Sequence, residues 1–339
     1  MGCMDHWHPV LAAKNLRQKP VGVRLNGREL VLFRDGRGQI GALDDCCVHR
    51  RMRLSLGSVS GGRLHCMYHG WSYDSQGNGE SPATPKMYAC APHYDVCEKY
   101  DWLWVKPTDA RAEFPALDVA GFEFAGTLYH EMEAPLEIVL DNFTEVEHTP
   151  TTHALLGYSI DRMPEVETKV ESTANSVRVF NAGPQKAISP VVAAVFGIHT
   201  GDRFVDDWTT YFSPVYTVYD QYWNDEKTGA EKGIRWRNVV FFNPLDAERT
   251  GLVTFAFYKP DPQGGWRNWL TFKPGLLWFV DREIRLDQEM VSKLADKSPS
   301  IEGMKLSRFD RVLGLNRARL ASVYRGTPAA TDLVGQGSP

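Results

Sequence analysis

Four residues near the N-terminus constrain this chain more than any other feature, because they form two short metal-binding half-sites. Cys47 and His49 read C-x-H, and after sixteen intervening residues Cys66 and His69 read C-x-x-H. Two thiolates and two imidazoles are the donors of a [2Fe–2S] cluster in which histidines replace cysteines on one iron. Each half-site supplies one sulfur and one nitrogen, so one iron can bind both cysteines while the other binds both histidines. Loss of thiolate charge makes such a cluster easier to reduce.

A structural zinc site is the alternative for these residues. A zinc finger of the C2H2 type places both cysteines before both histidines, whereas here the two types alternate. The segments CVHR at 47–50 and CMYHGW at 66–71 resemble the Rieske iron–sulfur motif, which usually reads CxHR and CPYHGW. Met67 is the one departure, because proline is common at that position. We expect this change to alter loop stiffness and not ligation.

Composition excludes several classes of partner. The 339 residues suggest two domains, and a hydrophobic content of 43% is ample for their cores. A net charge of −4 with a pI near 6.2 favours neither nucleic acid nor an anionic membrane as a partner. Neither a spanning stretch of about 20 apolar residues nor a secretory signal is visible, so we expect a cytoplasmic protein.

Four further cysteines, Cys3, Cys46, Cys90 and Cys97, remain after the cluster ligands. A chain of this size without a secretory signal does not need disulfides, so we expect free, buried thiols.

The first part of the chain reads as a small all-β domain. The β-prone runs Val21–Leu25, Glu29–Arg34, Ile40–Asp44 and Trp102–Lys106 are separated by Gly-containing turns. We predict a [2Fe–2S] domain over residues 1–110.

The second part mixes helices with long strands. Helical spacing covers Pro135–His148, Val280–Asp296 and Ser307–Tyr324, and β-prone runs cover the positions between them. The predicted strands are Thr168–Asn181, Trp208–Trp223, Ile234–Asn243 and Leu252–Lys259. This order predicts an α+β domain over 111–326, with an antiparallel sheet wrapped on a long C-terminal helix. We expect a disordered tail at 327–339.

A second metal-binding pattern occupies the middle of the chain. Asp141, Glu145 and His148 are spaced four and three apart, so we expect them on one face of a helix. Pro150 disfavours continuation of that helix, and a turn can bring His153 back beside His148. Two histidines with one carboxylate form the facial triad of non-haem Fe(II) oxygenases.

The carboxylate of this triad has four downstream candidates: Asp281, Glu283, Asp287 and Glu289. Ile284, Val291 and Leu294 form an apolar stripe, and Asp287 falls on it. A carboxylate that faces the core costs several kcal/mol unless it is paired or bound to metal. Asp287 is therefore the best candidate ligand, and a salt-bridged structural aspartate is the alternative.

At this point the chain resembles the catalytic α-subunit of the Rieske non-haem iron oxygenases. The segment DNFTEVEHTPTTH at 141–153 meets the family pattern, and the short chain is most similar to the vanillate O-demethylase and dicamba monooxygenase branch. The resemblance implies a C-terminal domain of the helix-grip (START/Bet v1-like) type. It also implies a mononuclear Fe(II) on His148, His153 and Asp287, with Asn142 close to the iron. Glu145 matches the bridging carboxylate, which is usually aspartate in this branch.

The resemblance further implies how the protein works. It implies a homotrimer in which His69 of one copy approaches Glu145 and His148 of the next, and a separate flavin and iron–sulfur reductase that supplies electrons. The expected function is a terminal oxygenase that uses O2 to hydroxylate or demethylate a small aromatic or cyclic compound. A ring cis-dihydroxylase, a simple electron carrier and a zinc-stabilised binding protein are the alternatives. Four arginines, Arg203, Arg235, Arg237 and Arg267, are candidate partners for a substrate carboxylate, although each also suits a surface position.

Overall fold

The computed structural model describes residues 5–117, 119–153, 156–260 and 273–327. The chain divides into two compact units. The N-terminal unit consists of residues up to Pro115 together with Asn243–Ala247, and the C-terminal unit contains residues 116–242 and those from Glu248 onward. The expected tail lies, from residue 328, outside the described part of the chain.

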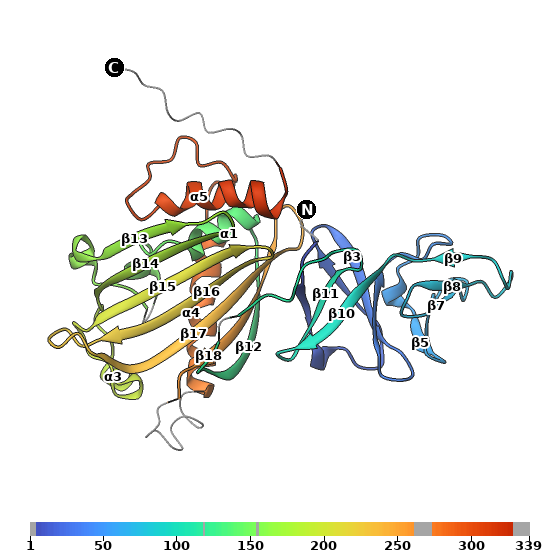
Figure 1. The fold of residues 1–339 in the computed structure, drawn as a ribbon, viewed down its shortest axis with the longest axis horizontal. Helices are drawn as coiled ribbons and strands as arrows, with labels where there is room; N and C mark the ends of the chain where they lie inside the picture. The colour runs from blue at the N-terminus through green and yellow to red at the C-terminus, as the bar shows by residue number, and fades with distance from the viewer. Residues whose placement is uncertain (1–4, 118, 154–155, 261–272, 328–339) are drawn as a thin grey trace. The chain divides into compact units, whose positions relative to one another are not determined.

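The N-terminal unit is all β, as the alternating sequence predicts, with two antiparallel sheets (Figure 1). The larger sheet has the order β1-β11-β10-β4-β3-β2, and the smaller has the order β5-β6-β7-β8-β9. The larger sheet comprises β1 (His8–Ala12), β2 (Val21–Leu25), β3 (Arg28–Arg34), β4 (Ile40–Asp44), β10 (His93–Lys99) and β11 (Trp102–Pro107). The smaller comprises β5 (Ser58–Ser60), β6 (Arg63–His65), β7 (Ser72–Tyr73), β8 (Asn78–Glu80) and β9 (Ala89–Cys90). Short 3-10 turns are η1 (Ala13–Asn15) and η2 (Leu54–Leu56).

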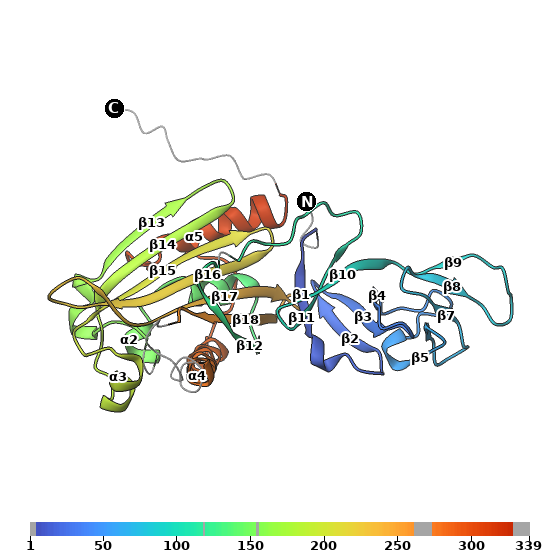
Figure 2. The same ribbon diagram turned by 60° about the horizontal axis from the view of Figure 1, so that its bottom comes forward.

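The C-terminal unit is built on one antiparallel sheet of seven strands in the order β12-β18-β17-β16-β15-β14-β13 (Figure 2). The strands are β12 (Glu123–Met132), β13 (Glu167–Ser172), β14 (Ser176–Pro184), β15 (Arg203–Phe212), β16 (Val215–Asn224), β17 (Glu231–Pro244) and β18 (Thr250–Tyr258). Two of the predicted strands are hairpins instead. The run 168–181 turns between β13 and β14, and the run 208–223 turns between β15 and β16. Both runs are β-prone throughout, so composition alone does not reveal their turns.

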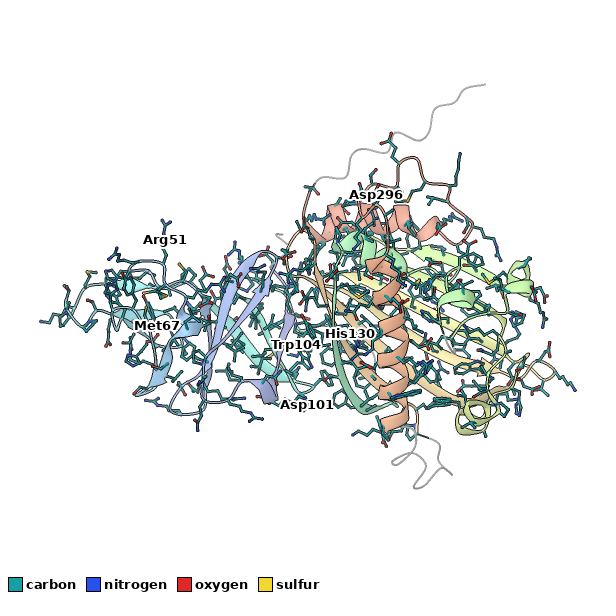
Figure 3. The ribbon with its side chains drawn as sticks, turned by 180° about the vertical axis from the view of Figure 1, so that it is seen from behind. Arg51, Met67, Asp101, Trp104, His130 and Asp296 are labelled. Carbon is teal, nitrogen blue, oxygen red and sulfur yellow. The ribbon has the colours of Figure 1, made fainter. Side chains whose placement is uncertain are left out.

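The helices of this unit are α1 (Leu136–Phe143), α2 (Thr149–Thr152), α3 (Pro190–Phe196), α4 (Lys273–Ser292) and α5 (Arg311–Arg319), with turns η3 (Ile160–Glu165) and η5 (Leu320–Tyr324). The long helix α4 lies against the sheet, which confirms the predicted α+β arrangement (Figure 3). His130 on β12 lies beside it, and its Nε2 is 3.0 Å from Asp281 Oδ1 of α4. None of the helices in the described ranges is long and apolar enough to cross a membrane.

Helix α1 is shorter than the sequence predicts. It ends at Phe143, so Glu145 and His148 lie beyond it. Glu145 Oε2 accepts hydrogen bonds from the backbone N–H groups of Glu147 and His148. These side-chain bonds compete with helical hydrogen bonds and start a new turn that leads into α2. The expectation that Asp141, Glu145 and His148 share one helix face is therefore wrong.

Candidate metal centres and substrate cavity

The two half-sites of the N-terminal unit lie in two loops. Cys47 and His49 follow β4, and Cys66 and His69 lie between β6 and β7. In the second loop Cys66 N–H donates to Trp71 O (2.7 Å) and Gly70 N–H to Cys66 O (3.1 Å). Gly70 has φ +70°, a conformation that residues with a Cβ rarely adopt. The two backbone hydrogen bonds and the conformation of Gly70 therefore form a tight loop that carries Cys66 and His69.

The cysteines and histidines of this site differ in exposure. Cys47 and Cys66 are 1% and 3% exposed, whereas His49 and His69 are exposed at the surface. The two imidazole rings approach to 4.6 Å between centroids, and His49 stacks on Trp71. Paired buried thiols beside paired exposed imidazoles fit a cluster with one sulfur-ligated and one histidine-ligated iron. The histidine side is the side open to an electron acceptor.

The neighbouring cysteine is not part of this site. Cys46 is exposed, whereas the Cys47 Sγ lies 3.1 Å from the buried Tyr73 hydroxyl. Tyr73 also accepts the backbone N–H of Val48 (3.2 Å). A phenol beside a cluster sulfur lowers charge at that sulfur. Cys46, Cys90 and Cys97 are free thiols. The expectation that they are buried is wrong, because Cys46 and Cys90 are exposed and Cys97 is only partly buried. Cys3 lies outside the described residues.

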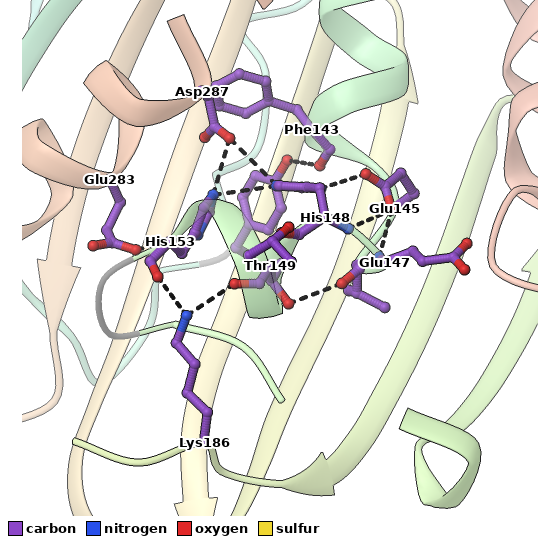
Figure 4. Close-up of polar contacts among 12 residues, drawn as sticks. Phe143, Glu145, Glu147, His148, Thr149, His153, Lys186, Glu283 and Asp287 are labelled. Carbon is purple, nitrogen blue, oxygen red and sulfur yellow. Dashed lines mark hydrogen bonds and ion pairs between the residues drawn. The ribbon is translucent and has the colours of Figure 1, made fainter. Parts of the chain in front are cut away.

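The second centre brings a local pair of histidines together with an aspartate that lies more than 130 residues further along the chain. Nε2 of His148 is 3.2 Å from Nε2 of His153, and Oδ1 of Asp287 lies 3.3 Å and 2.9 Å from these two atoms (Figure 4). One donor atom from each residue falls within 4.8 Å of the others. Two imidazoles and one carboxylate that converge in this way fit the facial triad of a mononuclear iron. The structure thus unites the three predicted ligands.

The charges around the triad favour a cation. Burial alone would raise the pKa of Asp287, but His153 and His148 hold it below its usual range. Burial alone would lower the pKa of His148, but Asp287 and Glu145 raise it to about 10. Asp287 is therefore ionised beside the two histidines, and a divalent metal can replace the proton that His148 would otherwise hold.

Each ligand histidine also faces a glutamate with its other ring nitrogen. Nδ1 of His148 contacts Glu145 Oε1, and Nδ1 of His153 lies 3.2 Å from Glu283 Oε2 (Figure 4). Carboxylates at Nδ1 orient the ring so that Nε2 faces the metal. The sequence suggested Glu283 only as a candidate metal ligand. Its position four residues before Asp287 on α4 places both on one face, and this was the available signal.

Lys186 holds the loop that carries His153. Its Nζ donates to Thr149 O (2.9 Å) and to His153 O, and burial lowers its pKa. The ammonium group thereby joins the two ends of the turn between the histidines. No sequence pattern pointed to this residue, because it lies more than thirty positions beyond the turn.

Asp141 and Asn142 have separate surroundings. Asp141 accepts two hydrogen bonds from Arg317 of α5 (2.8 and 2.5 Å), so its role is to join α1 to α5. Asn142 lines the cavity beside the triad, and its buried Nδ2 has no partner among the described residues.

A cavity opens at the triad between α4 and the sheet. Besides the metal ligands, its wall includes Asp206, Trp208, Gln221 and Asn238 from the strands. No lysine or arginine of the described ranges lines it.

The candidate arginines lie elsewhere. Arg235 and Arg237 bind Asp220 (2.6 and 2.7 Å), and Arg203 donates to a backbone carbonyl. Arg267 falls outside the described residues.

Two family models match the chain. Residues 6–95 match the Rieske [2Fe-2S] domain, and residues 132–264 match the vanillate O-demethylase oxygenase C-terminal domain. The vanillate O-demethylase oxygenase subunit of Pseudomonas sp. (strain HR199 / DSM 7063) is 31% identical over 49% of this chain and 49% of its own length. Protein TIC 55 of Pisum sativum is 30% identical over 52% of this chain and 34% of its own length. The chain thus spans between about a third and a half of these curated relatives.

Solved structures share the fold. Dicamba monooxygenase bound to dicamba has a TM-score of 0.67 at 19% identity and covers 94% of this chain and 96% of its own. Pseudomonas putida CBB5 NdmA with caffeine has a TM-score of 0.70 at 21% identity and covers 93% of this chain and 89% of its own.

Two metal centres on this pair of domains define a Rieske non-haem iron oxygenase, and the chain belongs to that family. Within it, the C-terminal domain assigns the chain to the vanillate O-demethylase and dicamba monooxygenase branch. The predicted family, fold class and pair of iron cofactors are confirmed.

Proposed function

We propose that this chain is a terminal oxygenase component that uses O2 and external electrons to hydroxylate or oxidatively demethylate a small aromatic or cyclic substrate. The observation that carries the proposal is the presence, in one chain, of a half-exposed [2Fe–2S] site and a three-residue triad beside a cavity. When bound, the cluster supplies single electrons and the triad iron binds O2 and activates it.

The chain's own residues account for the exit of the electron, its proposed transfer to the triad and the position of the substrate. His49 and His69 present the exposed side of the cluster site, where an electron can leave. Glu145 contacts His148 and is the proposed bridge to His69 of a neighbouring copy in a homotrimer. The cavity holds the substrate against the triad. Asn142 lines the same wall, and its Nδ2 has no partner in the part of the chain that the structure describes.

The relatives support a separate electron-donating partner, and the exposed thiols support a cellular location. Matches to oxygenase subunits support a separate NAD(P)H-dependent reductase with flavin and iron–sulfur centres, with or without a ferredoxin. The exposed free thiols of Cys46 and Cys90 suit a reducing compartment, which supports a cytoplasmic location.

Product analysis tests this function. Cluster- and iron-loaded protein, a surrogate reductase, NADH and O2 are incubated with meta-methoxybenzylamine, meta-methoxytoluene or meta-methoxybenzoate. We expect formaldehyde and the demethylated phenol, with one atom of labelled O2 per turnover in the formaldehyde and none in the phenol, which keeps the ether oxygen of the substrate. Two atoms inserted as a cis-diol would assign ring dihydroxylation instead. A cluster that turns over electrons without any oxidised product from these probes would leave only an electron carrier.

A further inference from the structure

The sheet wall of the cavity carries a polar network whose residues are direct neighbours across three strands. Asp206 on β15 pairs with Gln221 on β16, and Gln221 pairs with Trp236 on β17. Asn238 is two residues from Trp236, so its side chain lies on the same face. Asp206 and Asn238 are each 7% exposed, and both line the cavity beside the triad.

The hydrogen bonds of this network have a fixed direction. Trp236 Nε1–H can only donate, and it donates to Gln221 Oε1 (2.6 Å). The Gln221 amide group is thereby oriented with its NH2 toward Asp206, and it donates to Asp206 Oδ1 (3.1 Å). Asn238 Nδ2 also donates to Gln221 Oε1 (3.4 Å). An obligate donor at one end thus sets the orientation of both amides.

As a consequence, the atoms of this network that form no hydrogen bond within it, Asn238 Oδ1 and Asp206 Oδ2, are both acceptors. Asn238 Oδ1 is buried and has no partner among the described residues. Asp206 forms one side-chain bond, through Oδ1, within the part of the chain that the structure describes, which leaves Oδ2 unpaired. A buried acceptor without a partner is costly, so the position of Asn238 Oδ1 beside a cavity indicates a ligand or water that donates to it. Asp206 Oδ2 offers a second acceptor on the same cavity wall.

We propose that Asp206 and Asn238 form a substrate subsite that selects compounds with a cationic or hydrogen-bond-donating nitrogen group and disfavours anionic ones. This inference rests on the proposed function, since it names the substrate class of the same cavity. An amine or ring N–H would donate to Asp206 Oδ2 and Asn238 Oδ1 while the carbon to be oxidised faces the triad.

Two further observations support the subsite. Burial raises the pKa of Asp206 to about 7, and a cation or donor placed beside it would favour its ionised form. The cavity wall also offers no basic side chain among the described residues that could neutralise a substrate carboxylate. In addition, Trp208 Nε1 on the same strand as Asp206 is buried and has no partner within the described ranges, so it can donate to a neutral acceptor on the substrate.

Binding measurements test the proposal without turnover. Equilibrium dialysis of the loaded protein would give dissociation constants for meta-methoxybenzylamine, meta-methoxytoluene and meta-methoxybenzoate. We expect the amine to bind about tenfold or more tightly than the benzoate, as for a charge-assisted hydrogen bond. Asp206→Asn should reduce that ratio about tenfold, because it keeps an acceptor for Gln221 and removes the charge.

Asp207→Asn is the matched control. Asp207 is the next residue on β15, faces the opposite side of the sheet and pairs with Arg178 (2.7 Å), so its substitution should leave the ratio unchanged. The cluster absorption spectrum checks that each variant folds. Benzoate binding equal to amine binding, an unchanged ratio in Asp206→Asn, or no binding of the amine would overturn the subsite. Tight amine binding without any oxidised product would instead contradict the proposed function and leave the subsite intact.

Discussion

The two histidines of the candidate iron site each face a carboxylate with Nδ1. Glu145 lies three residues before His148 on the same turn, whereas Glu283 reaches His153 from α4. In both histidines the other ring nitrogen, Nε2, lies beside Oδ1 of Asp287. Glu145 is hydrogen-bonded to Nδ1 of His148 and can fix its tautomer, whereas Glu283 places a negative charge beside Nδ1 of His153. Only Glu145 follows a sequence pattern of the family, and its extra methylene relative to aspartate lengthens its reach.

Glu145→Gln tests the bridging role at this scale. The amide keeps the size of the side chain but removes the charge through which the proposed bridge would couple His148 to His69 of a neighbouring copy. We expect both metals to be retained, while the rate of cluster oxidation by O2 in the presence of meta-methoxybenzylamine falls at least about tenfold. Glu147→Gln, two residues away on an exposed face, is the control and should behave as wild type. Equal rates in the two variants would refute the bridge.

At the scale of elements, helices α1 and α4, which are more than 100 residues apart in the sequence, both contribute to the candidate iron site. Helix α4 supplies Asp287 and Glu283 one turn apart. Helix α1 is tied to α5 by the Asp141–Arg317 pair, whose side chains are 14% and 19% exposed. A buried ion pair of this kind is costly to break, because the remaining charge has no partner. The pair therefore stabilises the segment that leads into His148.

Arg317→Met should lower the free energy of unfolding by about 3 kcal/mol at neutral pH. Burial already raises the pKa of Asp141 to about 6, although Arg317 lowers it. Loss of Arg317 would raise this pKa further. A carboxyl whose pKa is raised in the folded state favours folding at low pH, and this contribution is lost as pH rises through the folded pKa. The deficit of the variant should therefore shrink as pH falls from about 7 to about 5.

Urea denaturation at both pH values measures this deficit. Arg311→Met, at an exposed position of the same helix, is the control and should lose less than about 0.5 kcal/mol. A deficit that grows toward low pH would mean that Asp141 is not the group left unpaired.

Local sequence patterns predict some features of the fold and the candidate site, whereas contacts between distant residues determine others. The candidate histidines and cysteines could be predicted because their spacing and flanks are local and chemically specific. Asp287, which the structure brings beside His148 and His153, could be predicted because a carboxylate on an apolar stripe needs a partner. The course of the chain after Phe143 was missed, because side-chain bonds from Glu145 override helical spacing there. Lys186 and Arg317 act across more than thirty and more than one hundred and seventy positions, so no local pattern reveals their partners.

At the scale of the whole molecule, the two units hold complementary chemistry. One presents an exposed pair of histidines at an electron-transfer site, and the other encloses a triad beside a cavity with acceptor groups. Neither unit alone combines the two. The proposed activity therefore requires both units. An intact cluster should not support oxidation of the substrate when the triad is lost.

A single-turnover measurement tests that claim most directly. Anaerobically reduced protein is mixed with O2 and meta-methoxybenzylamine, and both cluster oxidation and formaldehyde are quantified in wild type, Asp287→Ala and the exposed helix control Glu289→Ala. We predict formaldehyde in proportion to cluster oxidised in wild type and in the control. Asp287→Ala should keep its cluster but lose the mononuclear iron and form no formaldehyde. Formaldehyde from Asp287→Ala at the wild-type yield, or none from wild type, would contradict the account.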